Sequence, residues 1–147
     1  MFSKILYFRL SRKEFMKEFV YPSVDDIIEF NALMLSIIRV KKADQHKVLS
    51  VGKIAECIAE AEDCEGDLYD KAAVLMFMLV KNHPFASGNR RTAFITTKEF
   101  VLKNKGKFKI PNNSSNARVM IGIRERYYSN DKIKEWIKNG KIRKFER

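Results

Sequence analysis

The sequence predicts an all-α fold, a compact bundle of about six helices around one central apolar helix. The 147 residues include only six Gly and three Pro, and so few helix breakers favour long helices over a turn-rich β fold. Residues 72–80 form the longest apolar run, which is much shorter than the roughly 18 residues of a membrane span. A helix over 68–82 would be apolar on nearly all sides, so we expect the other helices to cover it on every side.

Two further helices are predicted before the central one. Ser23 can cap a helix start, Asp25 and Asp26 favour its first turn, and apolar residues then recur to about Val40. After a polar connection, we expect another helix over 51–61. Each of these helices carries one apolar face, which would pack on the rest of the bundle.

Three more helices are predicted after the central one. We expect them over 89–104, 116–127 and 131–139. Trp136 would anchor the last helix on the core, and Gly140 would close it. We therefore divide the chain into an N-terminal arm (1–21), a helical domain (22–140) and a basic C-terminal tail (141–147).

The charge is unevenly distributed. The formal net charge is +11, and residues 98–147 hold 15 Lys and Arg against 5 Asp and Glu. Such a basic region could meet nucleic acid, an acidic partner or membrane phosphates, but an ordinary solvated face explains it at least as well.

Cysteine usage and the N-terminal residues bear on the compartment. Cys57 and Cys64 are the only cysteines, they form no CxxC motif, and neither histidine stands at metal-ligand spacing from them. Two free thiols in a reducing compartment are the simplest interpretation. The apolar residues within 1–10 are interrupted by a Lys and an Arg, unlike the apolar core of a signal peptide. We expect a cytoplasmic protein without a membrane partner.

The loop after the central helix concentrates the chemistry. Pro84 disfavours helical geometry in the preceding residue, so His83 would lie at the lip of the helix. Gly88 and Asn89 tolerate the unusual backbone angles of a tight loop, which runs straight into the next helix start. Free N–H groups at a helix start bind anions, and the arginine pair 90–91 would strengthen that site. A base beside an anion site predicts a phosphate ester and a nearby proton transfer.

Residues 83–93, His-Pro-Phe-Ala-Ser-Gly-Asn-Arg-Arg-Thr-Ala, resemble the motif of the Fic/Doc (death-on-curing, Fido domain) family. The family loop reads roughly His-x-Phe-x-acid-Gly/Ala-Asn-(Gly or Lys)-Arg. The context agrees, since one helix start at 24–28 lies upstream and another at 67–73 leads into the motif. The resemblance extends over about residues 22–140, and it implies a helical fold and transfer of AMP or a phosphoryl group from ATP to a protein hydroxyl.

The resemblance implies roles for individual residues. His83 corresponds to the general base that takes the hydroxyl proton, a task suited to a side chain that titrates near neutral pH. Phe85 corresponds to the anchor that fixes the loop in the core. Gly88 and Asn89 match the anion nest, and Arg91 matches the arginine whose planar fork grips phosphate oxygens.

Two neighbouring positions decide how the motif is classified. Arg90 stands where Fic enzymes have Gly and Doc proteins have Lys, so the Doc-like branch is the nearer match. Phe94 stands where AMP-transferring members have a second arginine, which argues against a standard AMP transferase. Ser87, Arg90 and Arg91 complete the predicted nucleotide- and phosphate-binding set.

Ser87 is the main departure from the family pattern. It occupies the position of the acid that holds a phosphate-bound Mg²⁺, and its hydroxyl could ligate Mg²⁺ only as an uncharged group. The family's inhibitory pattern, Ser/Thr-x-x-x-Glu-Gly/Asn, is also incomplete here, because Ala61 lacks the hydroxyl before Glu65 and Gly66. The incomplete pattern leaves room for an inhibitor in trans, such as an antitoxin.

We therefore predict an ATP-dependent transferase that moves a phosphoryl or nucleotidyl (AMP) group to a hydroxyl of a target protein, with Mg²⁺, as in the toxin of a toxin–antitoxin pair. A catalytically weak or inactive binding protein of the same fold is the first alternative, because of Ser87. A nucleic-acid-binding protein that uses the basic last third is the second, although no DNA-reading motif accompanies it.

Overall fold

Six helices and no strands make up the part of the chain that the computed structural model describes, residues 18–37 and 45–146. The prediction of an all-α fold is confirmed. The helices are α2 (Val24–Ile37), α3 (Val51–Asp63), α4 (Leu68–Asn82), α5 (Asn89–Lys103), α6 (Asn116–Arg124) and α7 (Asn130–Asn139).

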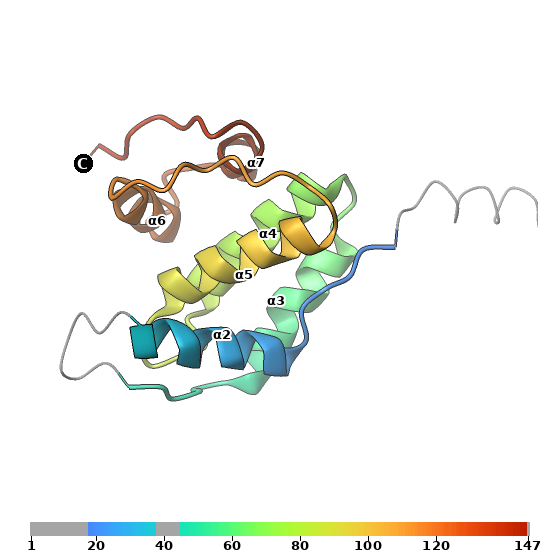
Figure 1. The fold of residues 1–147 in the computed structure, drawn as a ribbon, viewed down its shortest axis with the longest axis vertical. Coiled ribbons are helices and arrows are strands. Elements are labelled where there is room, and N and C mark those ends of the chain that lie inside the picture. Colours follow the sequence, from blue (N-terminus) through green and yellow to red (C-terminus); the bar gives the residue numbers. More distant parts are fainter. Residues whose placement is uncertain (1–17, 38–44, 147) are drawn as a thin grey trace, which may run out of the picture.

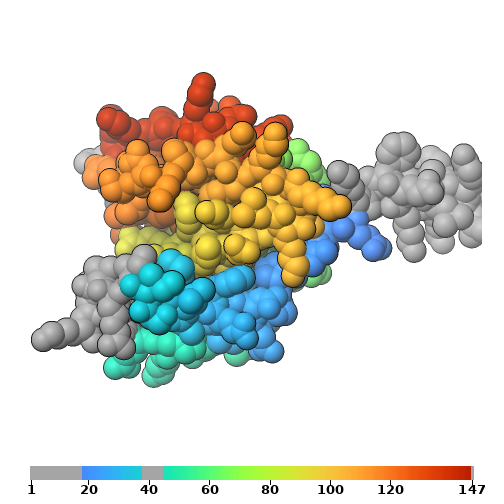
Figure 2. Space-filling model, viewed as in Figure 1, coloured from blue at the N-terminus to red at the C-terminus, as the bar shows by residue number. Residues whose placement is uncertain are grey.

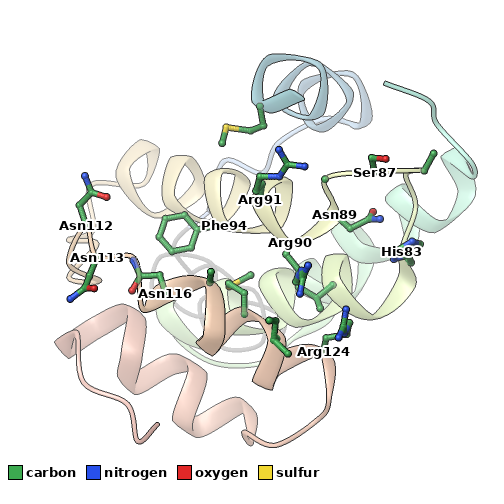
Figure 3. Close-up of a pocket in the computed structure, with 17 residues that line it drawn as sticks. His83, Ser87, Asn89, Arg90, Arg91, Phe94, Asn112, Asn113, Asn116 and Arg124 are labelled. Atoms are coloured by element: carbon green, nitrogen blue, oxygen red, sulfur yellow. The ribbon is translucent and has the colours of Figure 1, made fainter. Parts of the chain in front are cut away.

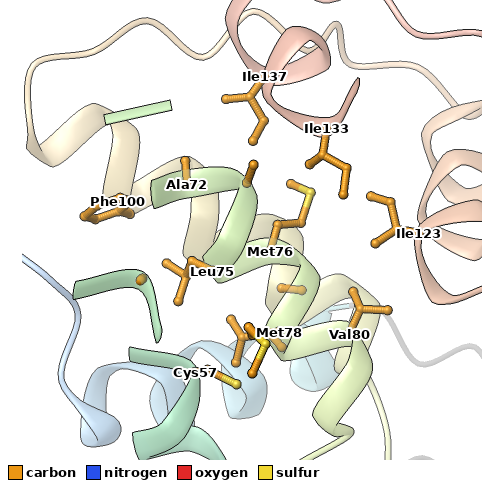
Figure 4. Packing of buried hydrophobic residues seen from close by; sticks show 14 of the residues in the cluster. Cys57, Ala72, Leu75, Met76, Met78, Val80, Phe100, Ile123, Ile133 and Ile137 are labelled. Atoms are coloured by element: carbon orange, nitrogen blue, oxygen red, sulfur yellow. The ribbon is translucent and has the colours of Figure 1, made fainter. Parts of the chain in front are cut away.

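Helix α4 is the centre of the bundle. It contacts α3, α5, α6 and α7, and Figure 1 shows α6 and α7 on one side of it and α2 and α3 on the other. On the face in Figure 2, α2, α5 and the segment after α5 lie one above the other. Buried side chains project from α4 toward all these neighbours (Figure 4). The predicted central helix is therefore confirmed.

The start of α4 is fixed by two aspartates. The Asp67 carboxylate accepts from the backbone N–H groups of Tyr69 and Asp70, and the Asp70 carboxylate accepts from the Asp67 N–H, which makes a reciprocal capping box. Lys134 of α7 reaches back to the same box, with Nζ 2.9 Å from Asp70 Oδ1. The box thus both begins α4 and ties α7 to it.

A lysine within this apolar helix closes its neighbour. Lys71 is only 8% exposed, and its ammonium donates to the carbonyls of Ala61, Glu62 and Cys64 at distances of 3.2, 3.1 and 2.6 Å. These carbonyls lie at the end of α3, where a cation compensates both the unmade hydrogen bonds and the negative end of the helix dipole. The buried charge therefore joins α3 to α4.

Helix α6 ends at Arg124, earlier than Tyr127, where the sequence predicted its end. Arg126 takes a left-handed φ of 58°, which ends the helix and turns the two tyrosines that follow. The ring of Tyr127 lies 5.1 Å from that of Phe145, and the Tyr128 hydroxyl donates to the Arg143 carbonyl. Aromatic packing against residues 141–146 has thus overridden helix propensity, and it holds this part of the basic C-terminal segment on the bundle.

The N-terminal boundary is described only in part. Residues 1–17 of the predicted arm and residues 38–40 of the predicted first helix lie outside the described ranges. Val20 exchanges two hydrogen bonds with the Asn104 side chain, and Tyr21 stacks on Phe100 with 5.3 Å between ring centroids.

None of the six described helices combines the length and apolar character needed to cross a membrane.

Candidate active site

The candidate site begins where α4 ends. Helix α4 stops at Asn82, and His83 follows with φ 49° and ψ 55°, a left-handed conformation that is uncommon for a residue with a side chain. Pro84, which is buried, comes next. This sharp reversal leaves the His83 side chain exposed at the helix end, as the sequence predicts.

A short extended segment before α3 holds the loop from the other side. The Pro84 carbonyl accepts hydrogen bonds from Leu49 N at 2.8 Å and from Ser50 N at 3.2 Å, and Ala86 N donates to the Lys47 carbonyl at 2.9 Å. Two chain segments far apart in sequence are thus paired by their backbones. The loop keeps a fixed shape although it has no regular structure of its own.

Phe85 anchors the loop in the core, and Asn89 clamps it. Phe85 is 1% exposed. The Asn89 side chain accepts from Phe85 N at 3.0 Å and donates to the Phe85 carbonyl at 2.8 Å. Because both ends of this amide are engaged with the loop, the predicted role of Asn89 in the anion nest falls to its backbone N–H.

Gly88 makes the transition from the loop into α5. Its φ is 78°, a left-handed angle that glycine adopts without strain. It provides no side-chain cap for the first turn of α5, which begins at Asn89 and closes with a 2.8 Å bond from Thr92 N to the Gly88 carbonyl. A helix start without a side-chain cap leaves amide groups and the positive end of the dipole for an anion.

A buried asparagine of α2 supports this transition from behind. Asn31 is fully buried, and its Nδ2 donates to the Ser87 carbonyl at 2.9 Å and to Thr92 Oγ1 at 3.0 Å. Its Oδ1 lies 2.8 Å from His46 Nδ1. The sequence alone did not indicate that Asn31 and His46 belong to the site.

The end of α4, the loop and the start of α5 border one cavity of about 660 Å³, a volume within the range of small-molecule sites. The predicted residues His83, Ser87, Gly88, Asn89, Arg90 and Arg91 all line it. Phe85 does not, which agrees with its place in the core.

One end of the cavity is strongly cationic. Figure 3 shows His83, Arg90 and Arg124 near one another, with Arg91 farther along the same helix as Arg90. Arg124 comes from α6, and no sequence motif indicated it. Burial, together with the charges of Arg124 and Arg91, lowers the pKa of Arg90. Like charges held this close favour the binding of an anion.

The other end of the cavity is neutral. Asn112, Asn113 and Asn116 gather there, and Phe94 lies between them and Arg90 in the view of Figure 3. The Phe94 ring also packs edge-on against Phe108, with 5.4 Å between centroids, so this position contributes packing and no charge. The sequence alone did not indicate the three asparagines, because only the fold brings the start of α6 and the segment before it to this wall.

The cavity suits an anion better than a bare cation. Among the described residues that line it there is no carboxylate, and Ser87 offers only a hydroxyl at the position of the family acid. Nor does any group of three or more His, Cys, Asp or Glu in the described ranges have the arrangement of a metal site. The donor set therefore does not fit a Mg²⁺ ion held by the protein's own charged ligands.

Comparison with known families agrees with this geometry. The sequence model that describes the Fic/DOC family matches residues 21–101, which is more than half of the chain. The match includes the whole loop, and it ends before Arg124 and the three asparagines of the opposite wall. It does not separate the Fic and Doc branches, so the Doc-like assignment stays a prediction. No curated protein matches the chain.

Proposed function

Because this chain belongs to the Fic/DOC family, we propose that it is a nucleotide-dependent transferase which moves a phosphoryl or nucleotidyl group to a hydroxyl of a target protein. One observation carries the proposal. The cavity places an exposed imidazole, an uncapped helix start and three arginines around one volume whose described lining contains no carboxylate. A nucleotide offers the matching chemistry, an anionic phosphate chain joined to a neutral base.

The proposed chemistry assigns a task to each group. The phosphates would lie at the α5 start, between Arg90 and Arg91, where N–H donors and planar guanidiniums meet phosphate oxygens. His83 would take the proton as the target's hydroxyl oxygen bonds to phosphorus and the bond to the leaving phosphate group breaks. The electron pair of the broken bond leaves with that phosphate group, whose charge the arginines stabilise.

Magnesium would enter this scheme only with the nucleotide. Since the lining offers no carboxylate, a Mg²⁺ ion would be held chiefly by phosphate oxygens, with the Ser87 hydroxyl as a neutral neighbour. Every step assigned above depends on the side chains and amides of the protein itself.

The test is transfer of label from ATP to protein. The chain is incubated with a cell extract and ATP labelled at either the α or the γ phosphorus, and the labelled position separates nucleotidyl from phosphoryl transfer. His83→Ala should lower the rate by about 100-fold or more, which is typical when a general base is lost. Absence of transfer with both labels, or full activity of His83→Ala, would refute the proposal.

The arginines allow a matched comparison. Arg124→Gln and Arg126→Gln remove the same charge two positions apart, but only Arg124 lines the cavity. We expect Arg124→Gln and Arg91→Gln to weaken nucleotide binding about tenfold, because each removes a charge-assisted contact, and Arg126→Gln to bind like the parent chain. Equal weakening by all three variants would indicate general charge attraction instead of a site.

A catalytically weak binding protein is the second candidate, and the carboxylate-free lining favours it. The Ser87→Asp variant separates the two functions. If the parent chain binds nucleotide but transfers no label, and Ser87→Asp gains transfer, binding is the function of the natural sequence. If the parent chain already transfers label through His83, Ser87 does not prevent catalysis.

A further inference from the structure

Asn31 makes three hydrogen bonds to three separate parts of the site. It lies on α2 between the buried residues Ile27 and Leu35, and it is fully buried itself. Its Nδ2 donates both of its hydrogens, one to the Ser87 carbonyl at 2.9 Å and one to Thr92 Oγ1 at 3.0 Å. A polar side chain with every bond made in the core specifies one arrangement of its neighbours.

His46 fixes the orientation of this amide. Because Asn31 Nδ2 is the donor toward the loop, Oδ1 must be the acceptor, and His46 Nδ1 at 2.8 Å therefore carries the hydrogen. Rotating the Asn31 amide by half a turn would place an oxygen against the Ser87 carbonyl and a nitrogen against His46. The three contacts thus support one another.

The bond to Ser87 sets the direction of the next amide group. The peptide between Ser87 and Gly88 is trans, like every described peptide, so its C=O and N–H point in opposite directions. With the carbonyl drawn toward Asn31, the Gly88 N–H points away from α2. A Cβ on Gly88 would lie 3.3 Å from Asn31 Nδ2 and 3.1 Å from Leu35 Cδ2, so α2 closes this side of the glycine.

Gly88 also lines the cavity, and within the described ranges its N–H makes no hydrogen bond to the protein. A buried or half-buried amide without a partner is expected to meet a ligand or solvent. The amide direction and the lining together place this donor in the cavity, beside the start of α5.

We propose that Asn31, oriented by His46, is a positioning residue that turns the Ser87–Gly88 peptide so that the Gly88 N–H donates to a phosphate oxygen. The inference rests on the proposed function only in taking the cavity as a phosphate site. Asn31 itself does not touch the substrate.

The sequence allows this one amide to be observed directly. Ser-Gly occurs once in the chain, at residues 87–88. Cell-free synthesis with carbonyl-¹³C serine and ¹⁵N glycine therefore gives a single carbonyl-coupled amide resonance, that of Gly88. Inorganic pyrophosphate is the probe, since its binding needs no catalysis.

Asn31→Leu is the test variant, because leucine has a similar shape and no charge or hydrogen-bonding group. Asn104→Leu is the matched control, since Asn104 also bridges two segments through its amide, to Val20 and Phe100, but does not line the cavity. In the parent chain and in Asn104→Leu, pyrophosphate should shift the Gly88 resonance. In Asn31→Leu the Gly88 resonance of the free protein should already differ from that of the parent chain. The dissociation constant for pyrophosphate should rise about tenfold or more, which is typical for the loss of a hydrogen bond to a charged group.

The outcomes separate this inference from the proposed function. Pyrophosphate binding with an unchanged Gly88 resonance in the parent chain would overturn the inference, whether or not label transfer is observed. So would equal affinities of Asn31→Leu and the parent chain. If Asn31→Leu does not fold, Asn31→Ser replaces it, because the shorter hydroxyl cannot reach the Ser87 carbonyl yet leaves a polar group in place, and the same shift and affinity are expected to change.

Discussion

Removing the Asn89 clamp should destabilise the whole protein as well as the loop. The side chain makes two hydrogen bonds to the backbone of Phe85, at 3.0 and 2.8 Å, in a region where Asn89 is 7% and Phe85 1% exposed. Asn89→Ala leaves the Phe85 N–H and carbonyl without these partners, and each buried group without a partner costs about 1–3 kcal/mol. Alanine regains about 0.6 kcal/mol of helix propensity. The two groups together, less the regained helix propensity, give an expected loss of about 1.5–5 kcal/mol in the free energy of unfolding.

Urea denaturation followed by circular dichroism measures this loss. Asn139→Ala is the matched control, because Asn139 is also a helical asparagine but is exposed and makes a single 3.3 Å contact to Glu135. We expect the control to stay within about 0.5 kcal/mol of the parent chain. If Asn89→Ala is no less stable than Asn139→Ala, Asn89 does not hold the loop as we argue.

Three further predictions concern the buried Lys71, the capping residue Asp70 and the two cysteines. Lys71→Met should lower the free energy of unfolding by about 2 kcal/mol, because the carbonyls at the end of α3 lose a charged donor; urea denaturation measures it, and no loss would contradict the capping role. Asp70→Asn should be destabilising at pH 7 but not in acid. Burial raises the pKa of Asp70, but hydrogen bonds from Lys134 and the Asp67 backbone lower it by more, so the net pKa is decreased. The stabilisation is therefore present above the ordinary value of 3.8 and is lost as the pH falls through the folded-state pKa. Thermal unfolding from pH 7 to pH 2 measures this, and a pH-independent difference would contradict it. Burial raises the pKa of both thiols, that of Cys57 to about 12, and Cys57 is buried whereas Cys64 is half-buried. Native protein should therefore be alkylated by iodoacetamide at Cys64 well before Cys57, as mass spectrometry can show, and equal rates would disprove this.

Local sequence signals predicted the helices and the loop. The apolar run at 72–80 identified α4, and the combination of Pro84 and Gly88 located the turn into α5. These signals depend on neighbouring residues, so the sequence alone carries them. The end of α6 was predicted too late, because the packing of Tyr127 on Phe145, a tertiary contact, decides it.

The opposite wall of the cavity could not be predicted in this way. Arg124 has no local feature that distinguishes it from Arg118 or Arg126 on the same segment, and only the packing of α6 against α4 brings it to the cavity. Asn31 did have a signal, since it is an asparagine on an apolar face, four residues from both Ile27 and Leu35. A polar residue at such a position requires hydrogen-bond partners, and here they are Ser87 of the loop, Thr92 of α5 and His46 before α3.

The most direct test of the account is a crystal structure of the chain with a non-hydrolysable ATP analogue. We predict phosphate oxygens at the start of α5, within hydrogen-bonding distance of the Gly88 N–H and Arg91, with one phosphorus close to His83. A nucleotide bound elsewhere, or with its phosphates among the asparagines at 112–116, would contradict the account.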